Sequence, residues 1–125
     1  MAIRVRTRYY SRTVEPMIGI LIRTRIGIDV YGTNTRVEKF DTGIVEASDE
    51  VEITFRFTCN LTPQQYTLTV ATQNSDGSSH DWLDDVLSFD VVSDRHAAGL
   101  IDFGARIDWQ VHHQESPIPT EQIQK

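Results

Sequence analysis

The feature that most constrains the fold of this chain is a period of two in its hydrophobic pattern. Apolar and polar residues alternate through residues 3–10, 51–59, 66–70 and 101–111. Such alternation is typical of β-strands with one buried face, and these segments are rich in the β-branched and aromatic residues that favour strands. Residues 17–24, 27–31 and 86–92 are more continuously apolar and predict further strands. No segment keeps a helical period over three turns.

Turn-forming residues punctuate the strands at 32–35, 62–65, 74–79 and 93–96. Seven or so short strands in 125 residues predict an all-β domain, an antiparallel β-sandwich of immunoglobulin-like or jelly-roll type. We assign the sandwich to residues 1–112 and interpret residues 113–125, which contain two prolines and no pattern, as a mobile polar tail. The domain is expected to be cut from a longer protein.

Composition removes several classes of protein. The single cysteine, Cys59, cannot form an internal disulfide, so a secreted disulfide framework is excluded. The longest apolar run is stopped by Arg23, and the first ten residues carry three arginines, so neither a membrane span nor a signal peptide is predicted. We therefore expect a soluble, cytoplasmic domain.

The net charge of −6 argues against a general affinity for nucleic acid or anionic membranes. The charge is unevenly spread, because residues 1–25 hold six arginines and one glutamate, whereas the rest holds six basic and seventeen acidic residues. A basic anion-binding surface is one interpretation. We favour the other, in which the basic face of the first strand complements acidic neighbours inside the domain.

Catalytic and metal-binding signatures are missing from the sequence. It has no Gly-rich phosphate loop and no Gly-x-Ser-x-Gly motif, and Cys59 lies in the apolar phase of a strand. The four histidines lack zinc-ligand spacing, and adjacent His112 and His113 would point to opposite faces of a strand. We predict no catalytic residue, no cofactor and no metal site.

A carbohydrate-binding surface is the remaining chemistry. Sugars stack on aromatic rings, and their hydroxyl groups form hydrogen bonds with planar polar groups such as Asp, Asn and Arg. The aromatic, acidic segment 80–85 is the best loop candidate, and the outward faces of the first and last strands offer further polar groups. The candidate glycan-binding residues are Tyr10, His80, Asp81, Trp82, Arg106 and Asp108. Trp109, in contrast, falls in the core phase of the predicted last strand.

The carboxylates of segment 80–85 allow another interpretation. A glycosidase needs two carboxyl groups on either side of a sugar, and Asp84 or Asp85 could serve. Nothing in the sequence indicates the buried carboxyl that such chemistry requires, so a solvated loop is favoured.

Several segments together resemble a known family. Residues 16–24 followed by 27–35 look like the paired strands of the Wzt C-terminal domain, and 59–70 resembles its segment of leucine, turn, tyrosine and strand. Residues 87–92 resemble its late strand, and Gly99 the glycine that follows. The resemblance covers about residues 3–111; it departs at Gln64 and Gln65, where the family commonly has glycine. Asn34 and Thr35 match the motif best, although turn capping also explains them.

The resemblance implies a non-enzymatic β-sandwich attached to the ATPase subunit of an ABC transporter that exports O-antigen or a similar bacterial surface polysaccharide. In this family the domain binds the glycan, often at a modified non-reducing end, and so couples completion of the glycan to export. The implied partners are the polysaccharide, a second copy in a homodimer, the ATPase domain of the same chain and the membrane subunit. The implied location is the cytoplasmic face of the inner membrane, without membrane insertion.

Two alternatives remain open. The chain could be a structural dimerisation domain, in which strand edges or an exchanged C-terminal strand pair two subunits and sugar binding is weak. The less favoured alternative is the glycan-processing enzyme that would use Asp84 or Asp85.

Overall fold

The computed structural model describes residues 1–73 and 79–113, and within this part of the chain every regular element is a strand. The predicted all-β fold is therefore confirmed. The strands are β1 (Ala2–Arg8), β2 (Thr13–Val14), β3 (Met17–Thr24), β4 (Asp29–Asn34), β5 (Ile44–Val45), β6 (Glu50–Arg56), β7 (Gln65–Gln73) and β8 (Ser79–Asp90).

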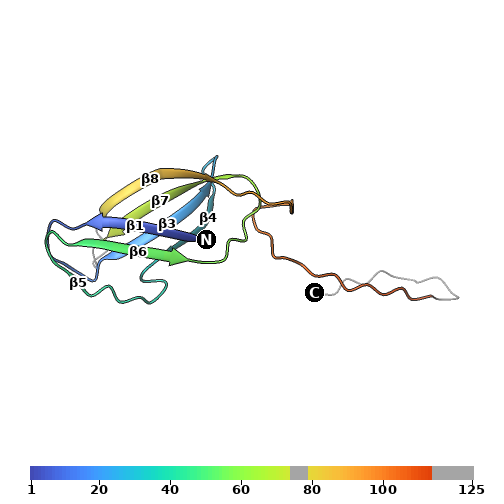
Figure 1. Cartoon of the computed structure of the whole chain (residues 1–125), viewed down its shortest axis with the longest axis horizontal. Helices are drawn as coiled ribbons and strands as arrows, with labels where there is room; N and C mark the ends of the chain where they lie inside the picture. The colour runs from blue at the N-terminus through green and yellow to red at the C-terminus, as the bar shows by residue number, and fades with distance from the viewer. Residues whose placement is uncertain (74–78, 114–125) are drawn as a thin grey trace.

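Two antiparallel sheets form the sandwich (Figure 1). A four-stranded sheet in the order β4-β3-β7-β8 is covered on one face by the two-stranded sheet β1-β6. The short pair β2-β5 lies at one end. Because the covering sheet has only two strands, part of the inner face of the larger sheet lies open.

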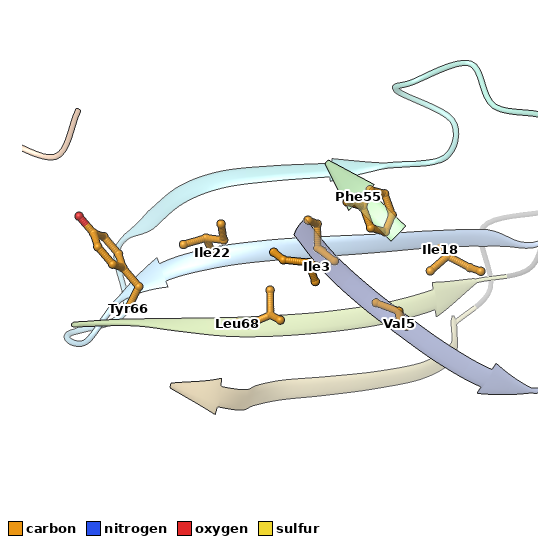
Figure 2. Close-up of a cluster of buried hydrophobic side chains, with 8 residues drawn as sticks. Ile3, Val5, Ile18, Ile22, Phe55, Tyr66 and Leu68 are labelled. Carbon is orange, nitrogen blue, oxygen red and sulfur yellow. The ribbon is translucent and has the colours of Figure 1, made fainter. Parts of the chain in front are cut away.

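The core lies between the two sheets and consists of the alternating residues that the sequence predicts. Ile3 and Val5 of β1 belong to one buried cluster with Ile22 of β3 and Leu68 of β7 (Figure 2). Phe55 of β6 completes the contact from the second sheet. Burial of each such side chain stabilises the fold by about 1.5–3 kcal/mol relative to exposure.

A buried tyrosine locks the turn before β7. The hydroxyl of Tyr66 donates a hydrogen bond of 2.7 Å to the carbonyl oxygen of Thr62, four residues upstream. The hydroxyl of Thr62 in turn donates to the carbonyl oxygen of Gly99 at 2.6 Å. This arrangement corresponds to the tyrosine corner of immunoglobulin-like sandwiches. It ties the segment after β8 to the start of β7.

The basic face of β1 is paired within the domain, as the charge distribution suggests. Arg6 Nε lies 2.8 Å from Glu52 Oε2, and Arg4 Nε lies 3.4 Å from Glu52 Oε1. Arg8 Nη2 approaches Glu50 Oε2 at 3.5 Å. The hydrogen bond from Arg6 lowers the pKa of Glu52, and nearby Arg4 adds to the effect. These side chains are exposed, so each pair contributes little stability, but their arginines have partners on β6.

Two predicted loops are strands in the structure. Residues 32–34 complete β4 instead of forming a turn, and the turn follows at residues 35–39. Residues 80–82 lie in β8, where Asp81 pairs with Thr72 and Trp82 with Ala71. In both places tertiary pairing prevails over local turn propensity, because β3 and β7 offer strand edges that need partners.

The predicted last strand is wrong for the single chain. Only Ile101 forms a bridge, with Leu61, and residues 102–113, here called the arm, run away from the sandwich (Figure 1). Trp109, expected in the core, is 82% exposed. The alternating pattern of the arm is real, but in the single chain its apolar side chains stay largely exposed.

Candidate functional site

The recess on the outer face of the four-stranded sheet is the first candidate site. It is a shallow hollow of about 190 Å³. One row across the sheet defines it: Asn34 of β4 lies opposite Gly19 of β3, and Gly19 lies opposite Ala71 of β7. Leu21, Met17 and Val37 add apolar walls, and Thr69 and Gln73 add polar groups.

Two glycines shape the recess. A Cβ atom at Gly32 would lie 3.0 Å from Cδ1 of Leu21, and one at Gly19 would lie 3.1 Å from Cβ of Asn34. Gly32 therefore leaves room for Leu21, and Gly19 for Asn34, to lie flat over a neighbouring strand. Glycine inside a strand often marks such a close approach. This signal was present in the sequence, but the candidate residues chosen there did not include these positions.

Asn34 is held in a fixed orientation. Its side-chain oxygen accepts a hydrogen bond of 2.8 Å from the backbone amide of Val37, at the start of the turn after β4. The same interaction caps the turn, as the sequence suggests for this residue. Because the oxygen is fixed, the amide nitrogen is the group that Asn34 can offer as a donor at the recess.

A charged cluster borders the recess beyond Thr69. Arg23 of β3 donates from Nε to Asp29 at 2.9 Å and from Nη1 to Asp84 of β8 at 3.1 Å. The hydroxyl of Thr69 lies 3.5 Å from the same Asp84 oxygen. The two carboxylates, Asp29 first, raise the pKa of Arg23. The guanidinium of Arg23 thus links β4 and β8, and its positive charge is already balanced by the two carboxylates.

The structure separates the residues predicted to bind glycan. Tyr10 is exposed just after β1, which ends at the opposite end of the sandwich from the arm that carries Arg106 and Asp108 (Figure 1). The backbone of Trp82 pairs with Ala71 and so continues the row that defines the recess. The side chains of His80, Asp81 and Trp82 lie outside the described residues. Their contribution to binding stays a prediction.

The geometry around Asp84 does not match that of a glycosidase acid. Asp84 is bound by Arg23 and Thr69, whereas the acid of a glycosidase requires apolar surroundings that keep it protonated. The side chain of Asp85 lies outside the described residues. Within residues 1–73 and 79–113, no group of three or more His, Cys, Asp or Glu side chains is placed to hold a metal ion.

The second candidate site is a groove of about 480 Å³ between β6 and β4. Its apolar walls include Tyr31, Phe40, Phe55 and Phe57. β1 occupies one edge of β6, since the amide of Phe57 donates to Met1 and the amide of Tyr9 donates to Asp49. Among the described residues no strand pairs with the other edge of β6, which borders the groove.

The arm matches this free edge in phase. Its first residues already pair beside the chain that leaves β6: the amide of Asp102 donates to Asn60, and the amide of Thr62 donates to Leu100. If the same register continues, three apolar residues of the arm oppose three core-facing residues of β6. These pairs are Ile107 with Phe55, Trp109 with Ile53, and Val111 with Val51. The odd-numbered residues of β6 direct their backbone hydrogen bonds at β1. The even-numbered residues therefore direct theirs at the free edge, where they would bind the arm, because the two sets alternate in an antiparallel ladder.

A polar corner turns the arm away from its own groove. Arg95 binds both carboxylate oxygens of Asp102, at 2.8 and 3.2 Å, and the amide of Gly104 donates to Asp102 Oδ1 at 2.8 Å. Gly104 has a φ of 64°, a conformation that favours glycine and interrupts an extended strand.

We predict that this corner survives in moderate acid. The hydrogen bonds from Arg95 and then Gly104 lower the pKa of Asp102 from 3.8 to about 2. Because the folded-state pKa is depressed, the stabilisation is complete above pH 4 and is lost as the pH falls through 2. The Gly104 amide resonance should titrate with a midpoint near pH 2. Arg95→Gln should move that midpoint upwards. A midpoint near 4 in the unchanged protein would contradict the contact.

Comparison with known proteins agrees with this architecture. A family model described as the Wzt C-terminal domain matches residues 1–103. The crystal structure of the C-terminal domain of a Wzt protein superimposes with a TM-score of 0.80 at 20% sequence identity, covering 87% of this chain and 69% of that one. No curated protein sequence matches the chain. In the described part of the chain, no helix is long and apolar enough to cross a membrane.

Proposed function

Because the chain belongs to the Wzt C-terminal domain family, we propose that it is the non-catalytic glycan-binding module of an ABC exporter for O-antigen. In this role it recognises the non-reducing end of the lipid-linked glycan at the cytoplasmic face of the inner membrane. Binding would couple completion of the glycan to export by the ATPase domain and the membrane subunit. Membrane insertion and nucleic-acid binding play no part in the proposal.

The observation that carries the proposal is the form of the recess. An apolar floor made by Gly19, Gly32 and Ala71 is bordered by the side chains of Asn34 and Gln73. Sugar rings present apolar C–H faces between hydroxyl groups that need partners, so they require this combination of surfaces. The recess also spans β4, β3 and β7, neighbouring hydrogen-bonded strands of one sheet, so its backbone is held in place before a ligand binds, which reduces the ordering cost of binding.

Filling the recess is expected to weaken glycan binding. The substitution Ala71→Leu places a branched side chain where the ring would lie, and it should reduce affinity for the organism's own exported polysaccharide at least tenfold in calorimetric titration. Ala98→Leu, the same substitution at an exposed position after β8, should leave affinity unchanged. Equal affinity of the unchanged protein and Ala71→Leu would remove the recess from the binding site.

The predicted residues give a second comparison on the same glycan. Trp82→Ala should weaken binding, because Trp82 continues the row of Gly19 and Ala71. Arg106→Ala should have little effect, since no residue of the arm lines the recess and the arm runs away from the sandwich (Figure 1). The opposite result would place the site on the arm and exclude the recess.

We also propose that the domain forms a homodimer by exchange of the arm. The support is the match in phase between the arm and the free edge of β6, together with the corner at Asp102 that directs the arm outwards. In the dimer each arm fills the partner's groove and adds a third strand to the sheet β1-β6. Its one unfavourable pair, Arg106 opposite Arg56, lies on the exposed face, where salt screens like charges.

A cross-link tests the register of the exchanged arm. Opposed residues that are not hydrogen-bonded in an antiparallel ladder have Cα atoms about 4.5 Å apart, within the range of a disulfide. In a Cys59→Ser background, Ile53→Cys with Trp109→Cys should give a covalent dimer under oxidation. Ile53→Cys with Val111→Cys, one pair out of register, should cross-link far more slowly. Only intramolecular cross-links would show that the arm folds onto its own chain.

A further inference from the structure

We propose that the two adjacent histidines of the arm, His112 and His113, bind the acidic residues Asp49 and Glu50 where the partner's β6 begins, and that this contact makes the exchanged dimer more stable in mild acid. The partner is a second copy of this chain. The inference rests on the proposed exchange of the arm, whose register it uses, and it does not depend on the glycan site.

The register of the arm places His112 opposite Glu50. Ile101 is bridged to Leu61, and in an antiparallel pair each residue further along the arm lies opposite one residue further back along the other strand. Continued to the end of the arm, this register brings His112 to Glu50. Both side chains lie on the exposed face of the sheet, to which the even-numbered residues of β6 point. Their Cα atoms would be about 5.5 Å apart, the spacing of a hydrogen-bonded pair.

His113 points to the other side of the sheet, because neighbouring residues of a strand point to opposite faces. The same register sets it opposite Asp49, whose Oδ2 accepts a hydrogen bond of 2.9 Å from the amide of Glu46. Among the described residues nothing donates to the second carboxylate oxygen of Asp49, so this oxygen can accept from an imidazole. The two histidines would therefore contact the partner's strand on both faces.

The carboxylate of Glu50 has room for a donor. Arg8 Nη2 lies 3.5 Å from its Oε2 and Arg6 Nε lies 3.8 Å from its Oε1, and no described group donates a hydrogen bond to it. Glu52, in contrast, accepts a bond of 2.8 Å from Arg6. A protonated His112 on the free side of Glu50 can supply the missing charge-assisted hydrogen bond.

The other charged groups along the groove also favour a protonated end of the arm. The charged residues of its lining are Glu38, Glu52 and Arg56. Glu52 is the diagonal neighbour of His112 on the exposed face. Arg56 lies opposite Arg106, roughly 20 Å from His112 along the strand. This distance exceeds the Debye length at physiological salt, so the repulsion between Arg56 and His112 is screened.

The protonation of histidine gives the direction of the pH dependence. An imidazole ordinarily takes up its proton near pH 6.5. The charged form of the arm histidines faces a carboxylate in the exchanged dimer, whereas in the single chain both side chains are exposed. The dimer is therefore favoured below pH 6.5, and this advantage is lost as the pH rises above it. Each pair of opposite charges across two strands contributes a factor of about 1.4–5, and the dimer contains four such pairs.

Sedimentation of the whole chain between about pH 5.5 and 8 measures the effect. The dissociation constant of the dimer should rise with pH at least about threefold. The variant His112→Gln with His113→Gln keeps the apolar face of the arm, so it should still dimerise, with a dissociation constant that does not change with pH. His96→Gln, at an exposed position outside the arm, should keep the full dependence. The inference is overturned if the dependence survives loss of both arm histidines or is absent from the unchanged protein.

A charge swap shows whether the contact joins two chains. The arm variant is His112→Glu, and the groove variant is Arg8→Glu with Glu50→Lys, which keeps opposite charges between β1 and β6. In each homodimer the arm then meets a like charge in mild acid, whereas in the mixed dimer both arms meet an opposite charge. Native mass spectrometry of the mixture should show more heterodimer than random pairing gives. A random proportion of heterodimer would contradict the contact.

The disulfide between Ile53→Cys and Trp109→Cys distinguishes failure of this inference from failure of the exchange. If the covalent dimer forms, but neither the pH dependence nor the excess of heterodimer is found, the histidine contact is wrong and the exchange stands. If no covalent dimer forms, both fall. The proposed glycan site is unaffected in either case, because Ala71→Leu tests it separately.

Discussion

The double substitution Ile107→Asp and Trp109→Asp in the arm is expected to convert a dimer into a monomer. Both side chains are largely exposed in the single chain, at 85% and 82%, and the exchanged arm would bury them in the partner's groove. Loss of their burial removes about 3–6 kcal/mol for each arm, by the usual 1.5–3 kcal/mol per large apolar side chain. Each arm alone therefore accounts for more than a hundredfold in the dissociation constant.

Light scattering at a series of protein concentrations measures this effect. The matched control is Arg106→Asp with Asp108→Asn, which changes charge at exposed neighbours in the arm and keeps its apolar face. The control should stay dimeric. A second variant that ends after Ile101 separates loss of the arm from introduction of charge, and it should also be monomeric. A dimer that persists in both the double variant and the truncated chain would contradict exchange of the arm.

The substitution Tyr66→Phe is expected to destabilise the fold by about 1–3 kcal/mol. Tyr66 is fully buried, and its hydroxyl satisfies the carbonyl oxygen of buried Thr62. Phenylalanine retains the ring and its stacking on Phe89 but leaves that acceptor without its donor, and an unsatisfied buried acceptor costs about this much.

Urea unfolding at one fixed protein concentration measures the change, because the midpoint of a dimer depends on concentration. The slope of the unfolding free energy against urea concentration, the m-value, should be unchanged. Tyr10→Phe, the same substitution at an exposed site, should change stability by less than about 0.5 kcal/mol. Equal effects of the two substitutions would mean that the tyrosine corner formed by Tyr66 and Thr62 contributes nothing to stability.

The sandwich could be predicted from the sequence because alternation reports directly on burial. The strand β3 was predicted with its observed limits, and the core residues Ile3, Val5, Phe55 and Leu68 all lie in the predicted apolar phase. The limits of β8 could not be predicted. Its first residues carry turn-forming side chains, and only the edge offered by β7 makes them a strand.

The candidate site was harder to predict, for two physical reasons. A recess made by small residues on three strands depends on which strands are neighbours, and a single sequence does not reveal that Gly19 lies between Asn34 and Ala71. The arm shows the second reason. Its pattern predicts a strand with a buried face, but a pattern does not reveal whether the covering surface belongs to the same chain or to another.

The most direct test of the central claim is to map the glycan on the protein by amide chemical shifts during titration with the exported polysaccharide. The account predicts that the largest shifts occur at Gly19, Gly32 and Ala71, on the outer face of the four-stranded sheet. It also predicts that Ala71→Leu removes them, whereas Ala98→Leu does not. Shifts confined to β1 and β6 or to the arm, with the recess unaffected, would contradict it.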